Sequence, residues 1–198
     1  MEIPFYKNLD LYCAQACMKM IIGYFDPKNK INLDKLSELS HKRKDGGTNS
    51  TGIVLAFHDL GYEVKLYTKT LEDEQLSPET QEYYDKYGID KKIKGSIIQK
   101  AKNKGLIIVK KLNLHNIKNF LDKKQGVIAL INWNKVVDKK GYTGHFVVLT
   151  KIVGNSIYFH QPGPNDATPN KKISRELFMN AFNSEGTDND VIIVKGKN

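Results

Sequence analysis

Two cysteines, Cys13 and Cys17, stand one helical turn apart in the stretch "DLYCAQACMKMIIGYF". A thiol acts as a nucleophile only as its thiolate, which a helix N-terminus and a neighbouring imidazolium both stabilise. The spacing of the apolar residues predicts a helix here, with Cys13 in its first turn and Cys17 one turn deeper. The alternative is that both cysteines are small apolar residues of a buried helix face. Position favours Cys13 as the candidate nucleophile.

A nucleophilic cysteine needs a base, and His145 opens the apolar segment "HFVVLTKIV". The imidazole in turn needs a third group that accepts a hydrogen bond from its other nitrogen and so fixes the tautomer. Gln161 is the candidate, because the Gly154-Asn155 turn predicts a hairpin that brings its strand beside that of His145. Symmetric pairing about the turn sets Gln161 opposite Val148, so a twist or bulge must bring it to His145. The alternative is that His145 is a structural histidine.

The remaining histidines fit the role of base less well. His41, His58 and His115 lie in helical or turn segments, and His160 points to the opposite face of its strand from Gln161. A metal site built from the two cysteines and a histidine is disfavoured, because structural zinc takes four ligands and more closely spaced cysteines. The sequence therefore predicts no metal centre.

The pattern of apolar residues, caps and turns predicts the elements that must position these side chains. Helices are expected over residues 10–24, ending at Gly23 and "DPKNK", and over 32–41, 51–61, 114–125 and 174–182. Strands are expected over 62–68, 106–112, 126–133, 145–153, 156–163 and 190–196. Helices come first and most strands later, which indicates the α+β class.

Residues 71–105 differ from the rest of the chain. They are highly charged, with tyrosine and isoleucine at helical spacing, which predicts a pair of surface helices inserted into one domain spanning residues 1–198. A lid over the cleft and a plain surface elaboration both agree with this composition.

The net charge of +9 comes from 31 lysines and arginines against 22 acidic residues, and only Arg43 and Arg175 are arginines. Arginine is the residue that binds phosphate and guanine with two parallel hydrogen bonds, so we expect a solvated lysine-rich surface and no nucleic-acid partner. No apolar stretch reaches the length of a signal peptide or a membrane span. We expect a soluble, cytoplasmic protein with two reduced thiols.

The candidate segments resemble those of the papain-like cysteine peptidases that remove double-glycine leader peptides from bacteriocin precursors. "LYCAQACMKM" resembles the motif Cys-Gly-x-Ala-(Ala/Cys)-(Leu/Met)-x-Met that opens their first helix, and "GYTGHFVVLTKIVGNSIYFHQPGPN" resembles their Gly-His segment. "TGIVLAFHDLGYEVKLY" and "KKISRELFMNAF" resemble the elements between and after these motifs, so that only residues 71–105 lie outside the resemblance. It implies a papain-like fold with N-terminal helices packed on a C-terminal antiparallel sheet, Cys13 as nucleophile, His145 as base, and no metal or organic cofactor.

The sequence departs from that family at three places. Ala14 replaces the glycine that follows the nucleophile. Lys7 and Asn8 stand where the family has a glutamine whose amide donates to the oxyanion, and losing such a donor lowers the rate by about 100-fold to 1,000-fold. Gln161 replaces an aspartate, and its neutral amide orients an imidazole but stabilises an imidazolium less. Asp166 is an alternative third member if its loop folds back.

The resemblance implies a cysteine peptidase or amidase that acts through an acyl-enzyme on a peptide or peptide-like substrate. An acyltransferase would use the same cysteine and histidine with an amine in place of water. A catalytically impaired relative that only binds peptides is the other alternative, because the oxyanion and third positions have both changed.

Overall fold

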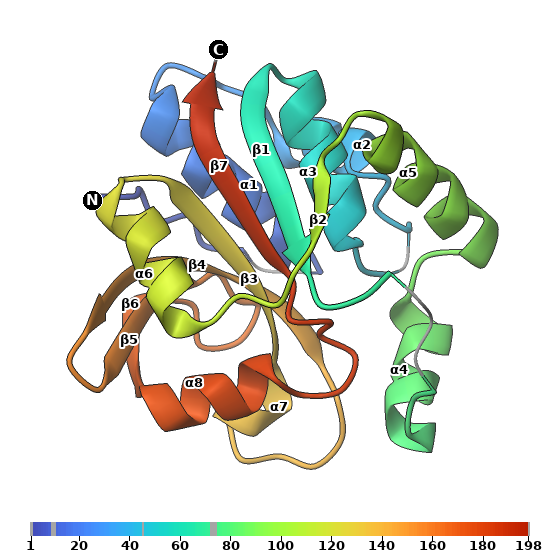
Figure 1. Ribbon diagram of the computed structural model, residues 1–198, viewed down its shortest axis with the longest axis vertical. Coiled ribbons are helices and arrows are strands. Elements are labelled where there is room, and N and C mark those ends of the chain that lie inside the picture. Colours follow the sequence, from blue (N-terminus) through green and yellow to red (C-terminus); the bar gives the residue numbers. More distant parts are fainter. Residues whose placement is uncertain (1, 9–10, 45, 72–74, 198) are drawn as a thin grey trace.

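The computed structural model of the protein describes residues 2–8, 11–44, 46–71 and 75–197 (Figure 1). Its helices are α1 (Cys13–Phe25), α2 (Leu33–Leu39), α3 (Ser50–Asp59), α4 (Pro78–Tyr87), α5 (Lys91–Asn103), α6 (Leu114–Asp122), α7 (Trp133–Val136) and α8 (Arg175–Phe182). Its strands are β1 (Tyr62–Thr68), β2 (Ile107–Val109), β3 (Gly126–Asn132), β4 (Gly144–Val153), β5 (Ser156–Gln161), β6 (Thr168–Ser174) and β7 (Val191–Lys197). The predicted α+β class is confirmed.

The described strands form one seven-stranded sheet in the order β2-β1-β7-β3-β4-β5-β6. β2 runs parallel to β1, and every other neighbouring pair is antiparallel. β7, the last strand in the sequence, lies between β1 and β3 and so joins the two halves of the sheet (Figure 1).

Two hydrophobic clusters cover the two faces of this sheet, because successive residues of a strand point to opposite faces. On β4, Phe146 and Val148 belong to the cluster under α1 to α3, whereas Val147 and Leu149 belong to the cluster under α6 and α8. Figure 1 shows the two sets of helices on opposite sides of the strands. The start of β4 therefore lies in the middle of the packed molecule, with a helical layer on each side.

Helix α1 begins at Cys13 and is buried along most of its length, from Ala14 to Ile22 apart from Lys19. The predicted first residues 9 and 10 lie outside the described residues. The expectation that Gly23 ends the helix is wrong, since the helix continues to Phe25. Glycine serves a packing purpose at that point, because a Cβ on Gly23 would lie 3.2 Å from Cγ of Pro4.

Side-chain caps begin the helices that the sequence predicted. Asn32 accepts from the backbone N–H of Lys35 at the start of α2, and Asn49 accepts from that of Thr51 at the start of α3. Ser174 caps α8 in the same way. Each cap satisfies an N–H group that has no partner within the helix, which is why these helices begin where the cap residues stand.

The hairpin of β4 and β5 forms as predicted, but its register differs from symmetric pairing. Ile152 pairs with Ile157 near the turn, and the register then shifts between Leu149 and Lys151. Val148 consequently faces His160 rather than Gln161. This irregularity moves Gln161 one position closer to the start of β4.

Three elements differ from the sequence prediction. β6 was not predicted, because its sequence "TPNKKIS" lacks apolar alternation and contains a proline, as the edge strand of a sheet can. Trp133 starts the short helix α7 instead of ending a strand. Helix α6 ends at Asp122, and Lys124, with a φ of 58°, makes the turn into β3 that was assigned to Gln125 and Gly126.

The charged segment 71–105 contains the two expected helices. α5 contacts α3, where Ile97 and Ala101 are buried. α4 stands apart from the main helical layers at the lower right of Figure 1. Only Thr80 of α4 is buried, so this helix is held mainly through polar and aromatic contacts.

Candidate active site

The two cysteines occupy different environments at the start of α1. Cys13 is partly exposed at the first position of the helix, and Cys17 is fully buried one turn later. The Cys17 thiol donates to the carbonyl of Phe146 at 3.3 Å. Cys13 lies against the other backbone group of the same residue, the N–H of Phe146, which acts as a hydrogen-bond donor toward its sulfur. Both thiols therefore contact the β4 residue that follows His145.

Burial raises the pKa of both thiols, and the partners of Cys13 offset part of that increase. The pKa of Cys13 is raised by desolvation and lowered by the backbone N–H groups of Phe146, Ala14 and Cys13 itself, and by the charge of Lys42. The pKa of Cys17 is raised much further, because burial lacks any such compensation. Of the two, Cys13 is the thiol whose anion the structure disfavours less.

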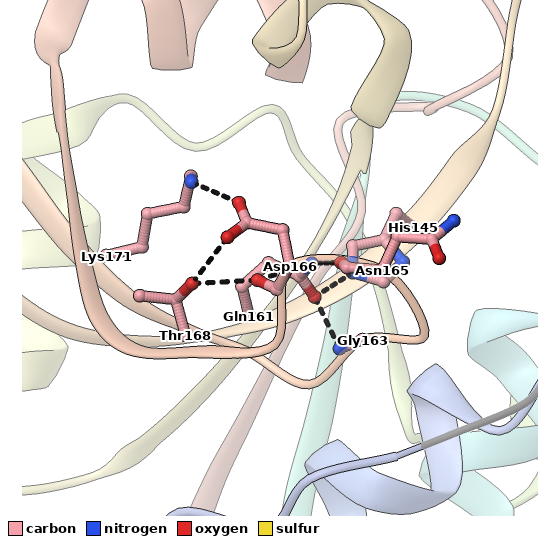
Figure 2. A network of polar contacts seen from close by, with 7 residues as sticks. All are labelled: His145, Gln161, Gly163, Asn165, Asp166, Thr168 and Lys171. Atoms are coloured by element: carbon pink, nitrogen blue, oxygen red, sulfur yellow. Dashed lines mark hydrogen bonds and ion pairs between the residues drawn. The ribbon is translucent and has the colours of Figure 1, made fainter.

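Gln161 contacts His145, and both the oxygen and the nitrogen of its side-chain amide are hydrogen-bonded (Figure 2). Its Oε1 atom is 3.0 Å from Nε2 of His145 and accepts from the N–H of Gly163 at 2.6 Å. Its Nε2 atom donates to the carbonyls of Asn165 at 2.6 Å and Asp166 at 3.2 Å. The amide orientation is therefore fixed. In the flipped orientation the NH₂ group of Gln161 would face the N–H of Gly163, and its oxygen would face the carbonyls of Asn165 and Asp166.

This arrangement fixes the tautomer of His145. Since Oε1 of Gln161 is an acceptor, Nε2 of His145 must carry the proton and donate it. The other nitrogen, Nδ1, is then the unprotonated one in a neutral ring. Nδ1 of His145 is consequently the atom that is able to take up a proton.

His145 is buried, and its ring centroid lies 5.2 Å from that of Trp133 at an interplanar angle of 53°. Burial lowers the pKa of His145 to about 4, although the hydrogen bond that His145 donates to Gln161 acts in the opposite direction. His145 is not among the groups of the described chain that shift the pKa of Cys13. With the pKa of His145 lowered and that of Cys13 raised, the imidazole on β4 and the thiol at the start of α1 are both neutral near pH 7 and do not form an ion pair.

Asp166, the alternative third member, turns its carboxylate away from His145. The carboxylate forms an ion pair with Lys171 at 2.6 Å and accepts from the hydroxyl of Thr168 at 3.1 Å. Its side chain is 58% exposed, and the lysine and threonine lower its pKa. Asp166 reaches the site only through its backbone carbonyl, which accepts from Gln161 (Figure 2).

The two candidates for the oxyanion site differ in burial. Asn8 is buried, and its backbone N–H donates to the carbonyl of Pro162 at 2.6 Å. A side chain at Gly163 would collide with the carbonyl of Asn8, which explains a glycine with a φ of 116° at that point. Lys7 is exposed. Asn8 thus lies beside the loop that follows Gln161, and residues 9 and 10, which connect it toward Cys13, lie outside the described residues.

Three further side chains reach this region, and the sequence did not single them out. Trp133 covers His145, and its position at the end of a buried strand was the only signal for it. The ammonium of Lys42 lies 4.7 Å from the ring centroid of Tyr12, the residue before Cys13. Tyr83, in α4, donates to the carbonyl of Gly144 at 3.2 Å.

The fold, with a cysteine at the start of α1 and a histidine at the start of β4, is shared with solved cysteine peptidase domains. The peptidase domain of Streptococcus ComA, a bi-functional ABC transporter involved in quorum sensing, superimposes with a TM-score of 0.56 at 17% identity, over 99% of this chain and 100% of that one. A double-glycine-motif protease of an AMS/PCAT transporter, in complex with its leader peptide, gives 0.55 at 19% identity, over 99% and 93%. A C39-like peptidase from Bacillus anthracis gives 0.56 at 14% identity, over 100% and 96%. The fold implied by the sequence motifs is confirmed.

By sequence family, the chain belongs to the guanylylate cyclases, because the model of that family matches residues 5–194. A search of curated proteins gives no match to this chain. The chain thus combines a guanylylate cyclase family assignment with the fold of cysteine peptidase domains.

The family name raises the question of a metal, since enzymes that act on nucleoside triphosphates commonly hold divalent cations with carboxylates. Across the described ranges, no three histidine, cysteine, aspartate or glutamate side chains come together as metal ligands. No helix within the same ranges is both long and apolar enough to cross a membrane.

Proposed function

We propose that the protein is a cysteine-dependent hydrolase that cleaves an amide bond of a peptide-like substrate through an acyl-enzyme. One observation carries this proposal: the fully hydrogen-bonded amide of Gln161 fixes His145 in the tautomer that leaves Nδ1 ready to accept a proton. A structural histidine has no need of a partner that is itself held by three further hydrogen bonds. The position of Cys13 at the start of α1, against the next residue of β4, supports the same interpretation.

The proposed reaction begins with Cys13 and His145 both neutral. As the sulfur of Cys13 attacks the substrate carbonyl carbon, its proton passes to Nδ1 of His145 and the carbonyl oxygen becomes an oxyanion. The backbone N–H of Cys13 and the side-chain amide of Asn8 are the proposed donors to that oxyanion, with Lys7 as the alternative. His145 then protonates the leaving amine, the C–N bond breaks, and a thioester remains on Cys13.

The second half of the reaction regenerates the enzyme. His145 takes a proton from water, the oxygen attacks the thioester carbonyl, and the acid product leaves as Cys13 recovers its proton. An acyltransferase would follow the same course with an amine in place of water. Because the amide of Gln161 is neutral, it stabilises the imidazolium formed in each step less than a carboxylate at the same position would.

A peptide substrate agrees with the comparison in which a protease domain of this fold is seen with its leader peptide. We place the protein in the cytoplasm, where a reducing environment keeps the two free cysteines available. In this proposal the lysine-rich surface serves solubility rather than nucleic-acid binding.

The test is the rate at which iodoacetamide alkylates each cysteine, measured by mass spectrometry near pH 7. We expect Cys13 to react much faster than Cys17, and we expect His145→Ala to slow the reaction of Cys13. Equal, slow labelling of the two cysteines would instead support a domain that only binds peptides. An unchanged rate in His145→Ala would remove the proposed pair.

The family assignment gives a second candidate, a guanylyl cyclase. It predicts that the protein converts GTP to cyclic GMP in the presence of Mg²⁺ or Mn²⁺, and that Cys13→Ala leaves this activity unchanged. The hydrolase proposal predicts the opposite dependence, a peptidase activity that Cys13→Ala abolishes. Measuring cyclase and peptidase activity in wild type and in Cys13→Ala distinguishes the two candidate functions.

A further inference from the structure

The start of β4 has one backbone edge that no neighbouring strand covers in the described residues. The N–H of Trp133 donates to the carbonyl of Thr143, so that carbonyl points toward β3. Because backbone groups alternate in direction along an antiparallel strand, the carbonyls of Gly144 and Phe146 point away from β3. On that side, the paired positions of β4 and β5 begin only at Val148.

Side chains from two helices occupy this open edge. α1 supplies the thiols of Cys13 and Cys17, which contact the N–H and the carbonyl of Phe146. α4 supplies the hydroxyl of Tyr83, which donates to the carbonyl of Gly144. Tyr83 thus takes the backbone acceptor that directly precedes His145.

Contacts around α4 hold Tyr83 in this place. Glu185 accepts from the backbone N–H of Ser77 at 2.5 Å and from the hydroxyl of Thr80 at 3.0 Å. The hydroxyls of Tyr84 and Tyr142 both donate to the carbonyl of Gly186. The ring of Tyr83 also packs edge-on against that of Tyr142, with 5.0 Å between centroids.

We propose that Tyr83 blocks the substrate-binding edge of the site: its hydroxyl occupies the Gly144 carbonyl that an extended peptide needs as acceptor for its own N–H, so the peptide binds by displacing Tyr83 and pairing with the backbone edge at Gly144. Strand addition at an uncovered edge is a common way for proteins to bind extended peptides. This inference rests on the proposed function, because it takes Cys13 as the nucleophile. It makes Tyr83 a specificity-determining residue that favours substrates with a free N–H next to the scissile carbonyl.

The phenol is suited to this role because it remains a donor at neutral pH. Burial and the negative charge that Cys13 would carry both raise the pKa of Tyr83 above its ordinary value. The hydrogen bond to Gly144 is 3.2 Å long, which is longer than is usual for a hydroxyl donor and therefore weak. A peptide N–H therefore has a modest interaction to replace.

The experiment compares two alkylating reagents on Cys13 in wild type and in Tyr83→Phe, which keeps the ring and removes the hydroxyl. The first is N-acetyl-alanyl-alanyl chloromethyl ketone, whose last N–H would donate to Gly144, and the second is iodoacetamide, which has no peptide N–H. In both reactions a sulfur–carbon bond forms, halide leaves, and the thiol proton is released. We expect Tyr83→Phe to raise the ratio of peptide-reagent rate to iodoacetamide rate by about 3-fold to 10-fold, the worth of one hydrogen bond.

Tyr87→Phe is the matched control, because it removes a hydroxyl of α4 from a ring beside Tyr83 and leaves the contacts to Gly144 and Gly186 in place. We expect its ratio of the two rates to equal that of wild type. An unchanged ratio in Tyr83→Phe, or an equal rise in Tyr87→Phe, would overturn the blocking role while leaving Cys13 as the nucleophile. A wild-type Cys13 that reacts with neither reagent faster than Cys17 would instead overturn the proposed function, and the blocking role with it.

Discussion

The loop after Gln161 and the helix α4 both reach the start of β4, and they are built in different ways. Gln161 is buried, and its hydrogen bonds go to groups within five residues in sequence or to His145. α4 is mostly exposed, and its anchors at Glu185 and Gly186 lie about a hundred residues away in sequence. The comparison teaches that the proton acceptor is held in advance, whereas the side chain over the substrate edge is held by contacts that can open one at a time.

The largest expected effect comes from removing His145, the proton acceptor that Gln161 holds in place. We expect His145→Ala to lower kcat/KM of the peptidase reaction by about 100-fold to 10,000-fold, the usual contribution of a general base. Exogenous imidazole is a check on this interpretation, since partial rescue by imidazole requires that the loss be one of proton transfer. A loss below 10-fold would contradict the role of His145.

Burial of the neutral ring also makes stability depend on pH. The folded-state pKa of His145 is about 4, below the ordinary value of 6.5, so the unfolded chain binds more protons between these two values. Stability is thus fully present above about pH 6.5 and is lost as the pH falls toward 4, by about 3 kcal/mol for this group. Urea denaturation at several pH values measures the loss.

The control for the pH experiment is His145→Gln, which cannot titrate and should lose about that much of the pH dependence. Its remaining slope has at least two sources: burial also lowers the pKa of His160, and it raises the pKa of Asp190 to about 7, which acts in the opposite direction. An identical slope in the variant and in wild type would contradict the buried, neutral state of His145.

Removing the orienting amide should have a smaller effect. We expect Gln161→Ala to lower kcat/KM by about 10-fold to 100-fold, as is typical for a residue that orients a functional histidine without contacting substrate. The profile of activity against pH should move as well, because the tautomer of His145 is no longer fixed. A greater loss of activity in Asp166→Ala than in Gln161→Ala would transfer the orienting role to Asp166.

On the side of α4, the expected effects are several-fold. Glu185→Ala removes the acceptor of Ser77 and Thr80, and we expect iodoacetamide to label Cys13 about 2-fold to 5-fold faster as the helix loosens. Glu63→Ala is the matched control, because it removes an exposed carboxylate that pairs with Lys195 on the sheet. Equal labelling in all three proteins would show that α4 does not restrict access to Cys13.

The smallest effect is expected at the exposed ion pair of Asp166 and Lys171. Exposed pairs contribute little, so Asp166→Ala should change kcat/KM by less than about 2-fold. The backbone carbonyl that supports Gln161 remains in this variant. A large loss of kcat/KM would mean that the loop needs the ion pair to hold the amide of Gln161. The loop, like α4, would then depend on exposed contacts.

The sequence predicted most of the fold because its strongest signals are local. The helices that Asn32, Asn49 and Ser174 cap lie in the segments where the sequence predicted helices, and the Gly154-Asn155 turn makes the hairpin that brings Gln161 toward His145. The sequence indicated that a twist or bulge must bring Gln161 to His145. It did not indicate that the irregularity would lie near Thr150, because the position of a bulge depends on packing across the sheet.

What the sequence did not reveal depends on contacts between distant segments. Tyr83 meets Gly144, and Glu185 meets Ser77, across more than sixty and a hundred residues, and no local pattern marks such pairs. The edge strand β6 was missed for a different reason, since a polar strand covered on one side carries no apolar alternation. The choice between Gln161 and Asp166 likewise needed the loop geometry, which sends the carboxylate of Asp166 to Lys171.

The central place of β7 in the sheet has a consequence for how the protein folds during its synthesis. During synthesis, the thiol-bearing helix emerges long before residues 191–197, yet the strands on either side of β7 have no direct pairing with each other among the described positions. Until translation has passed residue 197, β1 and β3 have no shared partner strand, and the two halves are connected mainly by the packing of α1 on β4. A chain that ends before this strand should expose the unpaired edges of β1 and β3 and aggregate.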